Sequence, residues 1–452
     1  MVVVAGAFAI DGCATDSDSS AIGAFEGLPI PDASQTIWLV TKATDSALDA
    51  GGAKGELRYA MNFAPEGTTI NFWLPQKSII TLAARLPRIT KDLTIDGLLG
   101  RDECVTSDDG KGCLTIGGTL GGDECVKSDG TEGKGCLTID GAGAALAPDG
   151  TNQGYRAFFI ESGTVRLQNL KIQNAVARGG NGGAPGGGGG LGAGGCVFVD
   201  NGDVTIANSV LSNCQAVGGT GGANNGNAGG GGGGGLDEDG SPSTGSPVAL
   251  KNGRSNYGPN GGAGGGTGGS GGSCTAIWDN TVLQVSDGNN ATFGGGGGGG
   301  ATDGATSYFN FQQQGSGNGG NGGFGGGGGG GWIGGTAGPG GGAGGSGQPY
   351  QGSIQNNPTS GGGGGAFGPA AFVHSGKLHI VASILGDFST KAGKGGAAPM
   401  VTQVITASPY VGSDGTAGTD PFYKFGGSID GAIWIEADHS KKDVSAITGS
   451  QQ

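Results

Sequence analysis

Charged side chains are scarce in this chain of 452 residues: they make up 13% of it, and the formal net charge is −14. Nucleic-acid binding and attraction to anionic membranes both need a basic surface, so neither is expected. The sequence also lacks an apolar run of about 18 residues, the length that a membrane-spanning helix requires. We therefore expect no nucleic-acid partner and no insertion into a membrane.

Glycine is the residue in excess, with 112 positions in the sequence. Collagen is excluded because its triple helix needs glycine at every third position and abundant proline. Here the prolines number 17, and the glycines come in blocks such as Gly229–Gly235 and Gly294–Gly300. Aromatic residues and short Val, Ile and Leu runs persist between the blocks, so parts of the chain can build a side-chain core.

The region 37–97 alternates between short β-type runs and turn residues, which predicts strands. The runs are Ile37–Val40, Thr68–Phe72, Ile79–Leu82 and Leu93–Ile95. Between the first two, residues 55–63 place apolar side chains at helical spacing and predict one short helix, which Pro65 ends.

The order of motifs in this region resembles the N-terminal signature of bacterial extracellular β-helix proteins. The matching residues are Val40-Thr41, Asp45, Gly55–Ala60, Thr69–Phe72, Ile80–Leu82 and Leu86–Gly97, with Glu56 in place of the usual Ser. The resemblance implies an all-β fold, a right-handed parallel β-helix (β-solenoid), whose first coil is capped by the short helix. It implies no chemistry.

Two kinds of internal repeat support a solenoid. Residues 102–116 return as residues 123–139, with a start-to-start period of 21 residues from Asp102 to Asp123. A strand–turn–strand pattern then recurs at 157–167, 196–206, 274–285 and 371–380, with a degenerate last copy at 431–438. These repeats resemble those of polymorphic and autotransporter-like bacterial surface proteins.

Composition divides the chain into four parts. Residues 1–36 are an N-terminal extension, and 37–175 are a capped N-terminal β-helix with duplicated Cys-stapled loops. Residues 176–440 are β-helix coils with glycine-rich insertions, and 441–452 are a polar C-terminal tail.

The glycine tracts lie between coils, at roughly 178–195, 218–235, 259–273, 294–300, 315–347 and 361–365. Flexible linkers are one interpretation. We favour a packed bundle of polyglycine-II helices, because the tracts hold few charged residues but include single aromatics such as Phe324 and Trp332. The tracts resemble the glycine-rich sheets of phage tail-tip adhesins, small antifreeze proteins and mycobacterial glycine-rich surface proteins.

Eight cysteines are present, without a CxxC motif. The duplication keeps a local pair in each copy, which predicts disulfides Cys104–Cys113 and Cys125–Cys136 and an oxidising compartment. Free buried thiols and a zinc site are the alternatives. The partners of Cys13, Cys196, Cys214 and Cys274 stay open.

The predicted strands contain no evident catalytic pattern, so we expect no enzyme and no cofactor. The acids gather in the Cys-stapled loops, where calcium binding is one interpretation and a solvated loop the simpler one. These acids are Asp102, Glu103, Asp108, Asp109, Asp123, Glu124 and Asp129. The three histidines, His374, His379 and His439, do not have a metal-ligand spacing.

The expected function is therefore that of a secreted, self-assembling structural protein, a subunit of a surface filament or matrix fibre. A cell-surface adhesin that binds glycan or host protein is the main alternative, and a polysaccharide-degrading β-helix enzyme is a weaker one. Residues 2–10 are apolar and β-prone, and we expect them to dock on a neighbouring copy and form a head-to-tail homopolymer. The candidate side chains are Val2, Val3, Val4, Phe8 and Ile10. A stub left by signal cleavage is the alternative for this segment.

Overall fold

The computed structural model describes residues 37–46, 51–99, 125–143, 154–223, 230–243, 264, 266–277, 282–300, 317–346, 360–397 and 411–450. The chain divides into two units, Met1–Thr36 and Ile37–Gln452, and the described residues all belong to the second. The polymerisation-strand candidates Val2, Val3, Val4, Phe8 and Ile10 and the cysteines Cys104 and Cys113 lie outside the described residues.

The fold is all-β with mostly parallel strands, and α1 (Leu57–Phe63) is the single α-helix of the described residues. The largest sheet has 12 strands. Its strand order begins with β1 (Ile37–Val40), β2 (Thr68–Phe72), β4 (Leu93–Asp96), β7 (Gly163–Gln168) and β12 (Gly202–Ala207). Counted from the other end, the order begins with β3 (Ile79–Thr81), β5 (Leu137–Asp140), β8 (Leu170–Gln173) and β13 (Val210–Ser212). The long β19 (Lys377–Leu385) pairs with both β12 and β13, and it is followed by β22 (Ser428–Ile435) and β23 (Ser440–Asp443).

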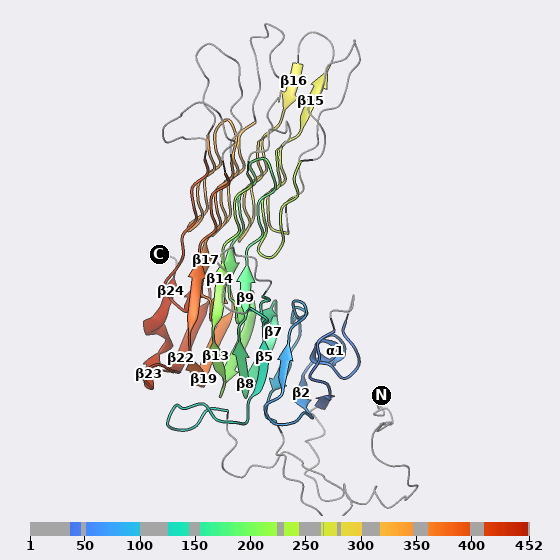
Figure 1. Cartoon of the computed structure of the whole chain (residues 1–452), viewed down its shortest axis with the longest axis vertical. Helices are drawn as coiled ribbons and strands as arrows, with labels where there is room; N and C mark the ends of the chain where they lie inside the picture. Colours follow the sequence, from blue (N-terminus) through green and yellow to red (C-terminus); the bar gives the residue numbers. More distant parts are fainter. Residues whose placement is uncertain are drawn as a thin grey trace, which may run out of the picture. The chain divides into compact units, whose positions relative to one another are not determined.

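Three smaller parallel sheets accompany the large sheet (Figure 1). One consists of β6 (Phe158–Ile160), β11 (Val197–Val199), β18 (Ala371–Val373), β21 (Phe422–Lys424) and β24 (Thr448–Ser450). Another consists of β9 (Val176–Arg178), β14 (Cys214–Val217) and β20 (Phe388–Lys391), and the third of β10 (Gly192–Ala193) and β17 (Ala366–Phe367).

From the layer of β6, β7 and β8 onward, the register between successive layers is the same across sheets, except for a shift of one residue between β19 and β22 after Ile380. Asn169 and Asn208, and also Asn174 and Asn213, are bonded partners 39 residues apart. The next layer is offset by 174 residues, as in the Ser209–Ser383 bond, and the one after by 51, as in the His379–Asp430 bond. An insertion of more than a hundred residues thus enters between two layers without shifting any strand, as expected of a repeat fold whose insertions leave from one edge.

Side chains that alternate along the strands build the core between the sheets. In β7 the residues Val165 and Leu167 are buried, and their partners Val204 and Ile206 in β12 are buried in the same way. Leu378 and Ile380 continue the two rows in β19. Fully burying one such side chain contributes about 1.5–3 kcal/mol, so these rows are the main stabilisation of the stacked strands.

Asparagine ladders hold the turns between strands. Asn169 and Asn208 both adopt positive φ, which Asn tolerates better than most residues, and their side chains are hydrogen-bonded to each other. The Asn213 Nδ2 amide donates to Asn174 Oδ1 at 2.6 Å in a second ladder. Each ladder bond joins one layer to the next, so the turns stack as regularly as the strands do.

The N-terminal end of the sheets is covered by α1, in the position expected of the cap. Leu57, Ala60 and Met61 of this helix are buried in the core. The Arg58 guanidinium is also buried and forms an ion pair with Asp45 at 2.7 Å.

Two expectations are corrected. The segment 274–285 is not a coil of the stack: β15 (Cys274–Ile277) and β16 (Val282–Val285) pair with each other in antiparallel fashion. A hairpin and a solenoid turn share the same strand–turn–strand pattern, and only the pairing partner separates them. The last copy of the repeat begins at Phe422 in β21 rather than at Gly431, which lies inside β22.

The expected polar tail contains further structure. After β23, the 3-10 helix η2 (Val444–Ile447) leads into β24, which pairs in parallel with β21. These elements continue the sheets beyond the last predicted coil.

Candidate functional site: the glycine bundle

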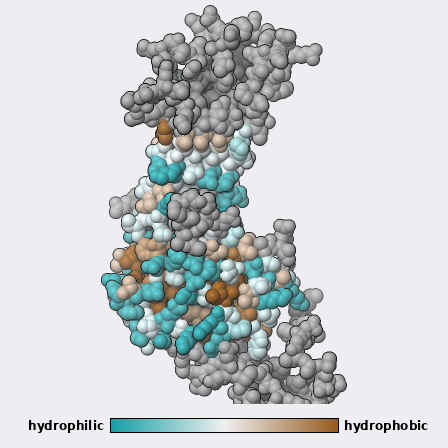
Figure 2. All heavy atoms as spheres, in the orientation of Figure 1, coloured by the Kyte–Doolittle hydropathy of each residue, from teal (hydrophilic) through white to brown (hydrophobic). Residues whose placement is uncertain are grey.

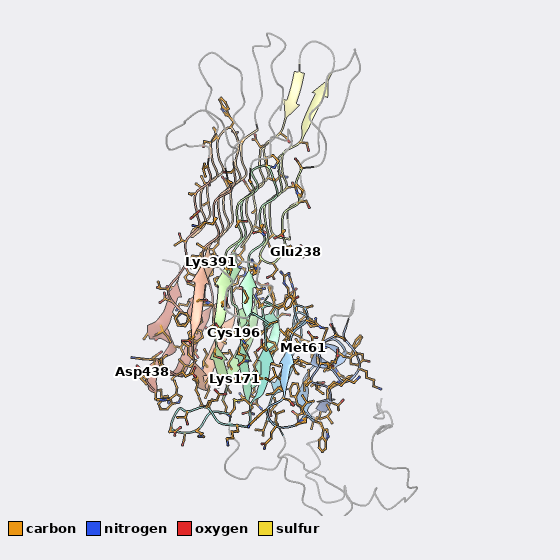
Figure 3. All side chains as sticks on the ribbon, in the orientation of Figure 1. Met61, Lys171, Cys196, Glu238, Lys391 and Asp438 are labelled. Carbon is orange, nitrogen blue, oxygen red and sulfur yellow. A yellow bond between two sulfur atoms is a disulfide. The ribbon has the colours of Figure 1, made fainter. Side chains whose placement is uncertain are left out.

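Glycine segments extend beyond the ends of β9, β14 and β20, and we call them together the glycine bundle (Figure 1). They are residues 179–183, 187–192, 218–223, 230–235, 237–243, 267–273, 286–292, 295–300, 317–323, 326–331, 334–339, 341–346, 360–365, 393–397 and 411–418. Figure 3 labels Glu238 and Lys391, which lie where the strands end and the glycine segments begin. On the face drawn in Figure 2, hydrophilic and hydrophobic residues are interspersed over the strands, whereas the bundle surface is mostly pale.

The backbone N–H groups of segment 187–192 donate to three neighbouring segments in strict rotation. From Gly187 to Gly192 the acceptors are the carbonyls of Gly183, Gly297, Gly362, Gly180, Gly294 and Gly365. Residues three apart therefore bond to the same neighbour. A chain with three residues per turn and no internal hydrogen bonds has this property.

The same rotation occurs in the neighbouring segments. From Gly326 to Gly331 the acceptors are Gly323, Gly189, Gly342, Gly320, Gly186 and Gly345. From Gly295 to Gly300 they are Thr292, Gly234, Gly327, Asn289, Gly231 and Gly330. When the bonds that it donates and those that it accepts are taken together, segment 187–192 is bonded to six segments. These are 179–183, 218–223, 230–235, 295–300, 326–331 and 360–365. In addition, the Leu191 N–H donates to Gly294, the residue that adjoins segment 295–300. This central part of the bundle is thus surrounded by other segments on every side.

Only glycine fits at most positions of these central segments, with Leu191 as the exception in segment 187–192. A Cβ added to Gly188 would lie 2.0 Å from the Gly327 carbonyl oxygen, and one added to Gly189 would lie 2.0 Å from that of Gly219. Ordering a glycine costs more than about 1 kcal/mol of backbone entropy, and one hydrogen bond returns a net of about 1 kcal/mol. A single segment would not order by itself, so the bundle depends on mutual bonding and on anchorage to the strands.

The outer segments have a different sequence pattern, which is visible in the sequence but was not among the expectations drawn from it. Every third residue is something other than glycine; the side chains of Asn321, Ile333 and Thr336 are exposed, whereas Phe324 is buried. The runs are Asn318-Asn321-Phe324, Ile333-Thr336-Pro339 and Thr267-Ser270-Ser273. Triplets of two glycines and one other residue thus mark the outer layer, and uninterrupted glycine marks the inside.

Side chains at these outward positions bond to the outward N–H groups of the next segment. The Asn321 Oδ1 oxygen accepts from both the N–H and the hydroxyl of Thr336, each at 2.9 Å. The Asn321 N–H donates in turn to Asn290 Oδ1 at 2.7 Å. Three residues earlier the Asn318 N–H donates to Asp287 Oδ1, also at 2.7 Å. Asn and Asp in the tracts therefore replace, at the surface, the carbonyl acceptors that a further segment would supply.

Aromatic side chains anchor the turns of the bundle against the strands. Phe198 of β11 and Phe372 of β18 stack with ring centroids 5.4 Å apart. Phe324, at a turn between two glycine segments, lies 6.1 Å from Phe372 and 5.6 Å from Phe293, centroid to centroid. These rings belong to one buried cluster that includes Leu191, so the apolar layer joins both regions.

A buried ion pair makes the second anchor. Arg156 is 4% exposed, and its Nη1 nitrogen lies 2.7 Å and 2.6 Å from the two carboxylate oxygens of Asp237, in the bundle. The same guanidinium donates to the carbonyl oxygens of Ala193 and Gly194. Burial lowers the pKa of Arg156, and the adjacent Asp237 carboxylate opposes that shift.

The structure pairs Cys125 with Cys136 in a disulfide, as the duplication predicts for the second copy. A second disulfide joins Cys196 to Cys214, two residues whose pairing the sequence left open. Both of its cysteines are fully buried in the core.

The loop closed by Cys125 and Cys136 is packed on strands of later layers. The Val126 N–H donates to Asn208 Oδ1 at 2.9 Å, and Glu132 accepts from Lys171 Nζ at 2.8 Å. An added Cβ on Gly130 would lie 2.5 Å from the indole of Trp434 in β22. The loop therefore contacts three later layers, a structural role that its acidic composition did not suggest.

Titratable groups elsewhere are paired rather than gathered into a site. His374 Nδ1 lies 2.6 Å from Asp200 Oδ1, and His379 is hydrogen-bonded to Asp430. Within the described ranges, no three His, Cys, Asp or Glu side chains are placed to hold a metal ion. None of the described helices is long and apolar enough to cross a bilayer.

Comparison of the chain with protein-family models, with curated proteins and with solved structures found no match.

Proposed function

We propose that the stacked sheets form a right-handed parallel β-helix and that its excursions form a polyglycine-II bundle. The offsets of 39 and 174 residues, which are the same in each sheet that joins these layers, support the first part. The rotation of hydrogen bonds among three neighbours, repeated every third residue, supports the second.

On this basis we propose that the protein is an extracellular structural protein that assembles into a filament or matrix fibre. The observation that carries the proposal is the bundle itself: a large region joined in several directions by backbone hydrogen bonds resists deformation and presents no reacting groups in its interior. The disulfides Cys125–Cys136 and Cys196–Cys214 are compatible with an oxidising compartment.

Electron microscopy of the purified full-length chain, with sedimentation over a range of concentrations, tests this proposal. We expect filaments or large linear assemblies whose mass grows with concentration. A monomer at all concentrations would contradict it.

An adhesin is the second candidate, and one observation favours it. Trp332 and Ile333, in the turn between segments 326–331 and 334–339, are 40% and 62% exposed. Exposed apolar side chains in a turn are typical of binding surfaces. Binding of the labelled protein to a glycan array, lost in a Trp332→Ala variant that remains folded, would support the adhesin over the fibre.

A further inference from the structure

The first strand of the large sheet has one edge that is open in the sense that no described strand pairs with it, although α1 packs beside it through Tyr59 and Trp38. β1 pairs with β2 on one side, and among the residues that the structure describes no strand lies on its other side. An edge strand presents unpaired N–H and C=O groups, to which another strand can add.

The surroundings of this edge are apolar. Ile37 in β1 is 45% exposed, Phe63 at the end of α1 is 54% exposed, and Trp73 after β2 is 49% exposed. The Trp73 N–H donates to the Val40 carbonyl oxygen at 2.8 Å, and the rings of Trp38, Tyr59 and Phe63 follow one another at 6.2 Å and 4.5 Å. We call Ile37, Phe63 and Trp73 the N-terminal patch.

The C-terminal branch of the sheet is protected, whereas β3, at the other end of the strand order, pairs only with β5 among the described strands. β23 folds back on the second half of β22 in antiparallel fashion and carries the exposed Lys441 and Lys442. Lysine on an edge strand disfavours pairing with another chain, because pairing would strip water from the charge. β1, with the sequence Ile-Trp-Leu-Val, has no such charge.

We propose that the open edge of β1 is the acceptor for residues 2–10 of a neighbouring copy. This inference rests on the proposed filament, because it names the contact between its subunits. Residues 1–36 precede β1 outside the described structure, and residues 2–10 among them are an apolar, β-prone segment. Nine residues are enough to cover the four of β1, and Val, Phe and Ile side chains suit the N-terminal patch.

The connecting residues allow such an exchange. Residues 11–36 form a stretch whose root-mean-square span, if flexible, is about 28 Å. Donor segment and acceptor edge are different surfaces, so the contact is heterologous and can continue from copy to copy.

Photo-crosslinking tests the contact directly. Benzoylphenylalanine replaces Ile37 in the full-length chain, and subunits labelled with ¹⁴N and ¹⁵N are mixed before assembly and illumination. We expect crosslinks from position 37 to residues 2–10 that join one label to the other. The control places the same photoprobe at Val381, which is 41% exposed but lies in β19, a strand with neighbours on both sides.

The outcomes separate this inference from the filament proposal. Filaments without crosslinks to residues 2–10, or crosslinks within one label alone, would overturn the inference and leave the filament standing. Mixed-label crosslinks without filaments would support the contact and contradict the filament.

An edge charge gives an independent measurement. We expect Ile37→Lys to lower assembly at least tenfold, measured as the concentration needed for half-maximal sedimentation, while Val381→Lys leaves it within twofold. Equal assembly by the two variants, both with wild-type melting temperature, would overturn the inference.

Discussion

The stacked strands and the glycine bundle are two solutions to the same problem, the ordering of a long chain. In the strands, side chains such as Ile95, Leu167 and Ile206 fill the space between sheets and are fully buried. In the bundle, the buried interior is backbone, and the space that a side chain would need is already occupied by a carbonyl oxygen. Figure 3 shows the contrast, with side chains crowded around the strands and sparse along the glycine segments.

The difference lies in what each region demands of its sequence. A side-chain core accepts apolar residues of similar volume at modest cost. The bundle contains residues of several kinds at the outward third positions, but central positions such as Gly188 and Gly189 leave no room for a side chain. The predictions below test whether this contrast holds.

The largest effect is expected for Gly189→Val. Its Cβ would lie 2.0 Å from the Gly219 carbonyl oxygen, inside a segment that other segments surround. We expect a loss of about 5 kcal/mol or more in the free energy of unfolding, measured by chemical denaturation. Ala343→Val, at an exposed outward position, should change stability by less than about 1 kcal/mol. Similar losses in both variants would refute the contrast.

Removing the charge that joins the two regions should have the next largest effect. Asp237→Asn leaves the buried Arg156 guanidinium without its counter-charge, and we expect a cost of about 3–5 kcal/mol. Glu238→Gln is the matched control, since this neighbouring carboxylate is exposed. Calorimetry would also show whether the variant separates one unfolding transition into two. An unchanged melting temperature would mean that the ion pair does not couple the regions.

Acid sensitivity should arise in the strand region, through Glu56. Burial raises the pKa of this carboxyl, but hydrogen bonds from Ser46, Ala53 and Thr44 outweigh burial and lower the pKa to about 2. The carboxylate therefore stabilises the fold fully above its unfolded pKa of about 4.5, and this contribution is lost as the pH falls from there through 2.

We expect Glu56→Gln to cost about 2 kcal/mol at pH 7 and progressively less below pH 4.5. Thermal unfolding of wild type and variant from pH 7 to pH 2.5 measures the difference. Glu66→Gln, an exposed carboxylate beyond α1, is the control. A pH-independent difference between wild type and Glu56→Gln would contradict the assignment.

The smallest effect is expected at the surface of the bundle. Asn321→Ala removes the acceptor of the Thr336 N–H and hydroxyl, and we expect a loss of about 1 kcal/mol because water replaces it. Thr336→Val keeps the N–H bond and should cost less. If Thr336→Val costs more than Asn321→Ala in denaturant unfolding, the ladder does not act through the backbone N–H.

The strands were predictable where local pattern decides. Residues 37–40 and 68–72 coincide with β1 and β2, and the short helix is α1, because alternation and the stop at Pro65 are local signals. The antiparallel pair at 274–285 was not predictable in this way, because the sequence pattern of a strand does not show which other strand it pairs with. The Cys196–Cys214 disulfide depends on the return of the chain after one layer, which no local spacing reveals.

The amino-acid composition allowed a glycine bundle to be predicted, but it did not predict how the segments are arranged in it. Runs such as Gly294–Gly300 show that backbone must pack against backbone. Which segments become neighbours depends on the strands from which the chain leaves and to which it returns. Segment 187–192, for example, lies in the stretch of chain between Arg178 of β9 and Ala193 of β10. The triplet spacing of Asn318, Asn321 and Phe324 was visible in the sequence and would have identified an outer segment.

Amide hydrogen exchange at the central glycines tests the account most directly. Peptides that cover residues 187–190 and 326–331 are compared with peptides from β11 and β12 in the same sample. The hydrogen bonds of the bundle predict that the glycine amides exchange as slowly as those of the strands, although no side chain covers them. Exchange of residues 187–190 and 326–331 at the rate of an unstructured peptide, while β11 and β12 stay protected, would show that the tracts are linkers and would contradict the account.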